Sequence, residues 1–129
     1  MTPTEVRKLI SLAEHGKIRD MAIYAQTCRK LDGLQAQIDG VRADKQEHDL
    51  SRGGDLNALA RWERWTEAEI TKLQSQHQEI EAEKETTRLV ALRSVAKVQA
   101  LEILLKKALK EEILINRRRA EQNGQPPDA

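Results

Sequence analysis

The sequence is nearly free of aromatic side chains: they make up 2% of its 129 residues, and none is phenylalanine. Aromatic rings supply much of the buried area of an ordinary globular core, so their scarcity argues against such a core. Charged residues make up 33% of the chain and almost cancel, leaving a formal net charge of +1. This balance argues against a general nucleic-acid binder, which carries a basic excess. The composition is typical of long helices and coiled coils.

Proline, cysteine and long apolar runs are also scarce. The three prolines stand at positions 3, 126 and 127, so none interrupts a helix between them. The single cysteine, Cys28, cannot form an internal disulfide, which is typical of a reducing compartment. No run approaches the roughly 18–20 apolar residues of a membrane span, and the charged N-terminus lacks the apolar core of a secretory signal. We therefore expect a cytoplasmic protein without direct membrane insertion.

Helix-capping residues, glycines and prolines predict two helices joined by one turn. Residues 2–5, Thr-Pro-Thr-Glu, form a capping box with proline at the first helical position. Residues 51–55 contain the only adjacent glycine pair and end in Asp55, which can cap the next helix. Asn123 and Gly124, followed by two prolines, mark the stop. We predict a single domain with a helix over about 3–50, a turn at 51–55, a helix over about 56–121 and a tail at 122–129.

Apolar residues of the first predicted helix recur at alternating spacings of three and four, the pattern of a coiled coil. Val6, Ile10 and Ala13 start the frame, and the apolar run from residue 31 to residue 41 continues it. Between these stretches the frame is polar, so we expect the apolar stripe to move one residue over, to Ile18, Met21, Ala25 and Cys28. We interpret three single glycines in this helix as soft or closely packed points: Gly16, Gly33 and Gly40.

The second predicted helix keeps one heptad frame along its whole length. Its apolar members are Leu56, Leu59, Ile70, Leu73, Ile80, Ala91, Val98, Leu101, Leu105, Ala108 and Ile115. Polar residues fill the rest: Glu63, Thr66, His77, Lys84, Thr87, Ser94 and Glu112. Since a short turn brings neighbouring helices back antiparallel, the sequence predicts an all-α fold, a long antiparallel two-helix coiled-coil hairpin with an overhanging C-terminal helix.

The position of the turn suggests which part of the second helix overhangs. A turn centred near residue 53 places residue i opposite roughly residue 106 minus i. This register brings Cys28 to the level of His77. Residues beyond about position 104 then lack a partner in the hairpin, an overhang of about 19 residues or roughly 28 Å. Exposed apolar stripes usually mark interaction sites. We therefore predict a partner-binding surface made of Leu105, Leu109, Ile113, Arg117, Arg118 and Arg119.

A second candidate surface contains the only two tryptophans, Trp62 and Trp65. At a spacing of three they share one helical face, close to the predicted turn. One interpretation is that they pack the thin end of the hairpin. The other is that they are partner-binding anchors, because tryptophan is enriched at binding hot spots.

We find no constellation that predicts catalysis. His15, His48 and His77 lie far apart without a metal-binding spacing. Cys28 on the apolar side of its helix is typical of packing, and no orienting group or substrate site can be placed beside it. The glycine pair lacks the context of a phosphate-binding loop. We therefore expect no enzyme, no cofactor and no metal.

The architecture, together with residues 99–123, QALEILLKKALKEEILINRRRAEQN, resembles the FliJ/YscO family of type III export proteins. In that region leucine and lysine or arginine alternate at helical spacing before a Glu/Arg-rich end. The resemblance implies a cytoplasmic coiled-coil stalk that docks on the hexameric export ATPase and contacts the membrane export gate component. In some members it also implies handling of export chaperones. Such a stalk would lie at the inner face of the membrane through its partners.

Two alternatives stay open from the residues alone. A generic structural coiled coil would bury the overhang by self-association and have no export role. A nucleic-acid-associated hairpin would have to use Arg117, Arg118 and Arg119, the only basic cluster that could serve it. The net charge and the absence of neighbouring base-stacking aromatics favour no nucleic acid among the partners.

Overall fold

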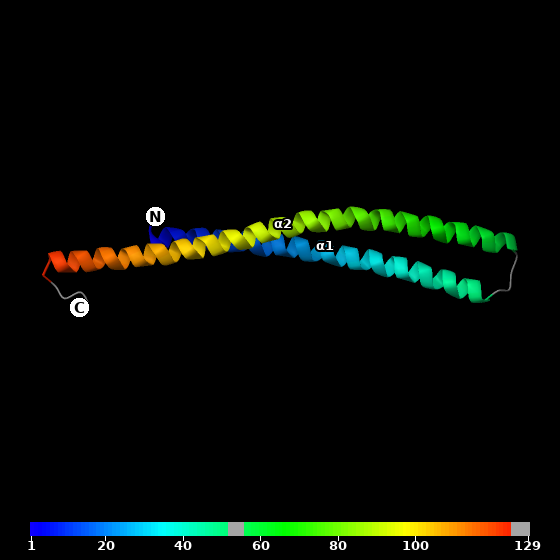
Figure 1. Ribbon diagram of the computed structural model, residues 1–129, viewed down its shortest axis with the longest axis horizontal. Helices are drawn as coiled ribbons and strands as arrows, with labels where there is room; N and C mark the ends of the chain where they lie inside the picture. The colour runs from blue at the N-terminus through cyan, green and yellow to red at the C-terminus, as the bar shows by residue number, and fades with distance from the viewer. Residues whose placement is uncertain (52–55, 125–129) are drawn as a thin grey trace. The chain divides into compact units, whose positions relative to one another are not determined.

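The computed structural model describes residues 1–51 and 56–124, with side chains described for 1–47 and 56–124. Its elements are two α-helices, α1 (Pro3–Ser51) and α2 (Leu56–Gln122), which pack against each other (Figure 1). Within these ranges the chain has no strand. The prediction of an all-α helical hairpin is therefore confirmed. The predicted cap Asp55 lies outside the described residues, as do the rest of the turn after Ser51 and most of the tail.

Both predicted helix ends are present in the structure. The backbone N–H of Thr2 donates to Glu5 Oε2 at 3.3 Å, and the N–H of Glu5 donates to Thr2 Oγ1 at 3.2 Å. This reciprocal pair is the capping box. At the other end, the N–H of Gly124 donates to the carbonyl of Glu121 at 3.1 Å. Gly124 has a φ of 69°, a left-handed conformation that favours glycine.

The hairpin consists of two compact units, each made from one stretch of α1 and one of α2. Unit 1 comprises Met1–Met21 and Val90–Ala129, and unit 2 comprises Ala22–Leu89. The buried residues of unit 1 are Val6, Ala13, Asp20, Ala91, Val98 and Ala108. Those of unit 2 are Thr27, Ile38, Thr66 and Leu73. These cores are thin and made of small or branched side chains, as the scarcity of aromatics led us to expect.

The expected shift of the apolar stripe on α1 is wrong. Asp20 and Thr27, which belong to the original heptad frame, are buried, whereas Ile18 and Met21 are exposed. The polar groups are satisfied where they lie: the Thr27 hydroxyl donates to the carbonyl of Ile23 at 3.0 Å, and Asp20 accepts a hydrogen bond from α2. Polar side chains with hydrogen-bond partners can occupy a coiled-coil seam at a moderate cost in stability. The seam of α1 therefore keeps its heptad frame through this polar stretch.

The register predicted from the turn is also wrong. Ser94 Oγ donates to the Asp20 carboxylate in unit 1, and Lys45 Nζ lies 3.7 Å from Glu67 Oε1 in unit 2. The numbers of these partners sum to 114 and 112, not to the predicted 106. Each α1 residue therefore faces a position about two turns further along α2 than predicted. Interdigitation of the seam side chains, not the middle of the connecting segment, sets the register of the pair.

Leu73 offers a test of how much the thin core of unit 2 contributes. It is 6% exposed in the seam, whereas Leu12 of unit 1 is 70% exposed. We expect Leu73→Ala to lower the free energy of unfolding by about 2–3 kcal/mol, since it removes buried methyl groups and leaves a void. Leu12→Ala is the control and should change stability by less than about 0.5 kcal/mol. Urea unfolding followed by circular dichroism measures both. Equal effects would mean that Leu73 is not in the core.

Candidate docking surfaces

The end of α2 extends beyond the first turn of α1, as Figure 1 shows for the orange and red part of α2 within unit 1. Burial locates where α1 stops covering it: Ala108 is 8% exposed, Leu109 is half-buried, and every residue from 110 to 119 is exposed. We call residues 110–122 the free segment. At about 1.5 Å per residue it is roughly 20 Å long. It is shorter than the predicted overhang because the register is shifted.

This boundary divides the predicted partner-binding residues. Leu105 and Leu109 are half-buried on the stretch that α1 covers, so their prediction as part of an uncovered stripe is wrong. Ile113 is 53% exposed and lies in the free segment. Two neighbours outside the predicted set of partner-binding residues are equally exposed, Leu114 at 50% and Ile115 at 47%. The apolar cluster of the free segment is therefore these three consecutive residues, which point in three directions around the helix and do not share one face.

The three predicted arginines are all exposed and follow the apolar cluster within two turns of α2. None of Arg117, Arg118 and Arg119 forms an ion pair with another residue in the part of the chain that the structure describes. The last turn of a helix favours cations because of the helix dipole. With the apolar cluster beside them, the arginines complete a surface suited to a partner with apolar and acidic groups.

Trp62 and Trp65 stack on each other, with ring centroids 5.3 Å apart and ring planes inclined by 24°. Trp62 is half-buried, whereas Trp65 is 53% exposed. Stacking of this kind stabilises by about 0.5–1.5 kcal/mol beyond area burial. The pair therefore combines the two interpretations: one ring is largely covered, and it supports a second ring that faces outward. Partner binding by this pair stays a prediction.

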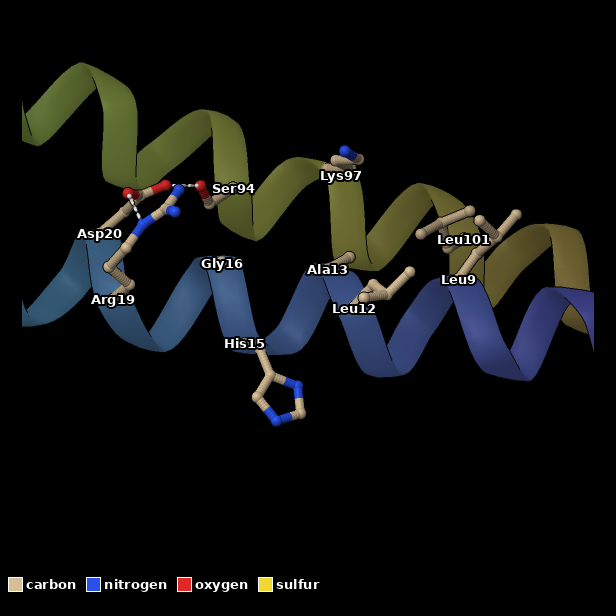
Figure 2. A pocket seen from close by; sticks show the side chains of 10 residues that line it. All are labelled: Leu9, Leu12, Ala13, His15, Gly16, Arg19, Asp20, Ser94, Lys97 and Leu101. Atoms are coloured by element: carbon tan, nitrogen blue, oxygen red, sulfur yellow. Dashed lines mark hydrogen bonds and ion pairs between the residues drawn. The ribbon is translucent and has the colours of Figure 1, made fainter.

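A groove on one side of unit 1 was not foreseen from the sequence. It has a volume of about 720 Å³ and lies between the first turns of α1 and the stretch of α2 around Lys97 (Figure 2). Leu9 and Leu101 lie together at one end, and Asp20 with its partners lies at the other. Gly16 lies between them, and a Cβ added there would meet nothing within 4 Å. The missing side chain leaves the groove open.

The polar end of the groove holds an interhelical hydrogen bond. The Ser94 hydroxyl of α2 donates to one carboxylate oxygen of Asp20, and Arg19 Nε donates to the other at 3.3 Å. The Ser94 hydrogen bond is the main reason that the pKa of Asp20 lies below its ordinary value. Arg19 lowers it further, and partial burial opposes both. The buried carboxylate is thus held in its charged form and ties the two helices of unit 1 in one register.

The lowered pKa of Asp20 predicts how stability depends on pH. Because the folded state favours the charged carboxylate, the stabilisation is complete above the ordinary aspartate range of roughly pH 4 and is lost as the pH falls through the lowered pKa. Asp20→Asn removes this charge. We expect the difference in melting temperature between wild type and Asp20→Asn to shrink steadily below about pH 4. A difference in melting temperature that stays constant down to acid pH would contradict the role assigned to Asp20.

The proposed proximity of Cys28 and His77 is wrong. Tyr24, one turn before Cys28, interacts with Lys84 and Arg88 of α2, and a hydrogen bond with Cys28 is the main cause that raises the pKa of Tyr24. The Nδ1 atom of His77 lies 4.0 Å from Glu81 Oε1 on its own helix. The shifted register accounts for the difference, since it brings Lys84, not His77, to the level of Cys28.

Metal-binding groups and membrane-spanning helices were also sought among the described residues. They include no group of three or more histidine, cysteine, aspartate or glutamate side chains that could hold a metal ion. The ring of His15 points away from α2, and its Nδ1 lies 2.7 Å from the carbonyl oxygen of Ser11 (Figure 2). Among the described helices, none has the length and apolarity to cross a bilayer.

Together these features define an antiparallel coiled-coil hairpin with three candidate docking surfaces: the free segment, the stacked tryptophans and the groove of unit 1. Comparison of the chain with protein-family models, with curated proteins and with solved structures gave no match. The chain's own surfaces are therefore the guide to its function. Of the groove, only the α1 side could have been suspected from the sequence, because Gly16 interrupts a helical face that also carries Leu9 and Leu12.

Proposed function

We propose that the chain is a non-enzymatic stalk of a flagellar or related type III protein export apparatus and docks on the export ATPase through its free segment. The observation that carries the proposal is the uncovered end of α2, where Ile113, Leu114 and Ile115 are about half exposed beside three exposed arginines. Apolar side chains on a helical end that is not covered by its own hairpin favour a partner. The resemblance to export stalk proteins supplies the identity of that partner.

The stacked tryptophans would supply the second contact of this stalk, with the membrane export gate component. Trp65 is half exposed and is held by the ring of Trp62. A rigid aromatic ring binds at a small entropic cost, which suits it to a hot spot. The two contacts use different units of the hairpin, so each can be removed without the other.

Reconstitution with the purified export ATPase of the same genome tests the proposal. We expect the full chain to co-elute with the ATPase in size-exclusion chromatography and to stimulate its ATP hydrolysis. Binding should weaken as salt rises, because the arginine cluster contributes through charge. Absence of both co-elution and stimulation at low salt would refute the export role.

A homodimer is the principal competing outcome, since a second copy could also cover the apolar cluster. Sedimentation equilibrium of the chain alone distinguishes the two. A monomer over the accessible concentration range supports docking on another protein. A stable dimer that Ile113→Ser converts to a monomer would identify a self-associating coiled coil instead.

A further inference from the structure

The groove of unit 1 has a feature that the export role does not use: its floor is apolar and its flanks are basic. On α1 it is lined by Leu9, Leu12 and Gly16, and on α2 by Leu101. Leu12 is 70% exposed, and Leu104, one heptad beyond Lys97 on the same side of α2, is 38% exposed. Isolated apolar residues on a surface are ordinary. Several that line one groove with an unfilled centre mark a docking position.

The charges beside this groove are mainly positive, although the heptad frame also places Glu5, which accepts a hydrogen bond from the Thr2 N–H, and Glu111 of the free segment on this side. The heptad frame places Arg93, Lys97 and Lys107 along the groove side of α2, and all three are exposed. Arg19 flanks the groove on α1. The carboxylate of Asp20, which lines the groove, already accepts hydrogen bonds from Ser94 and Arg19. A partner entering the groove therefore meets positive charge.

The opposite side of unit 1 can be compared with the groove side in its apolar residues and its charges. It too exposes apolar residues, with Ile18 at 66% and Leu92 at 50%. Its charged positions in the heptad frame alternate in sign, since they include Arg7, Glu14, Glu102 and Lys106. Both sides of unit 1 are thus similarly apolar, and only the groove side has an excess of one charge.

We propose that the groove of unit 1 binds an amphipathic helix of another protein that carries acidic residues beside its apolar stripe. A large apolar side chain of that helix would enter the space above Gly16, and its carboxylates would pair with Lys97 and its basic neighbours. The free segment of a second copy fits less well, since its arginines would face these basic flanks. This binding is independent of the export ATPase and of the free segment.

A pair of synthetic helical peptides of about 20 residues tests the proposal with the full chain. Both have leucine at the core positions of a heptad repeat, and they differ only in having glutamate or lysine at the flanking positions. We expect fluorescence anisotropy to give about tenfold tighter binding of the acidic peptide at low salt. The preference should disappear at high salt.

Matched variants locate the binding. Leu12→Glu and Lys97→Glu should weaken binding of the acidic peptide about tenfold. Their controls, Ile18→Glu on the opposite side and Lys72→Glu in unit 2, should leave it unchanged. Gly16→Leu is the most telling variant, because it fills the groove while it favours the helix. It should raise the melting temperature and still lower the affinity.

Three results would overturn the proposal. The first is equal binding of the acidic and basic peptides, and the second is an equal loss with Ile18→Glu and Leu12→Glu. The third is a dimer of the chain alone that Leu12→Glu dissociates, which would make a second copy the occupant of the groove. A loss of ATPase binding with intact peptide binding would refute the export role and leave this proposal standing.

Discussion

Ending the chain at Leu109 is expected to abolish binding to the export ATPase and to leave the hairpin folded. The deletion removes the free segment, in which residues 110–119 are all exposed. Because few contacts are lost, the free energy of unfolding should change by no more than about 0.5–1 kcal/mol. Stimulation of ATP hydrolysis should fall to the level of the ATPase alone.

Point variants separate the parts of this surface. Ile113→Ser combined with Ile115→Ser should weaken ATPase binding roughly 30-fold, the loss of one hot spot. Replacing the three arginines by glutamine should mainly weaken binding at low salt, because charge there acts through long-range attraction. The matched control is Ile103→Ser, which changes an isoleucine that is 57% exposed on the covered stretch of α2. Undiminished binding by the chain that ends at Leu109 would exclude the free segment as the docking surface.

Replacing Gly16, Gly33 and Gly40 together by alanine is expected to raise the free energy of unfolding by about 3 kcal/mol. All three lie inside α1, and an added Cβ at each would meet nothing within 4 Å. Each alanine then contributes its full helix propensity without a clash, and distant sites add. For a chain of this size the melting temperature should rise by roughly 10 °C.

Gly124 provides the control for this triple variant. Its φ of 69° strains any other residue, although the space around it is equally open. Gly124→Ala should therefore give no stabilisation. A triple alanine variant that melted at or below the wild-type temperature would contradict the open space around these glycines. The two helices would then lie closer together in solution than they do in the structure.

Local signals in the sequence predicted the helices and their ends. The capping box at Thr2 and Glu5 and the stop at Gly124 act within a few residues, so propensity and hydrogen-bonding chemistry suffice to predict them. The seam of α2 was also predictable between Leu59 and Ala108, where the predicted heptad frame is buried or half-buried. Leu56 and Ile115, the ends of that frame, are exposed. The seam of α1 was mispredicted where it is polar. Apolarity alone could not foresee that Asp20 and Thr27 would be buried with their hydrogen-bond partners.

The register and the surfaces that depend on it needed the structure. No rule of turn length could show that Asp20 pairs with Ser94, because side-chain packing along the whole seam decides the offset. That offset moved Leu105 and Leu109 from the predicted docking surface to the covered stretch. It also brought Leu9 beside Leu101 and so formed the groove. The candidate site was therefore predictable in kind, an exposed end of α2, but not in its boundary.

Hydrogen–deuterium exchange of the chain, alone and with the export ATPase, tests the central claim most directly. In the chain alone, amides of residues 110–122 should exchange faster than those of residues 91–108, because α1 covers only the latter. On addition of the ATPase, protection should appear in residues 110–122 and leave residues 91–108 unchanged. Protection of the free segment in the dilute chain alone, or no change when the ATPase is added, would contradict the account.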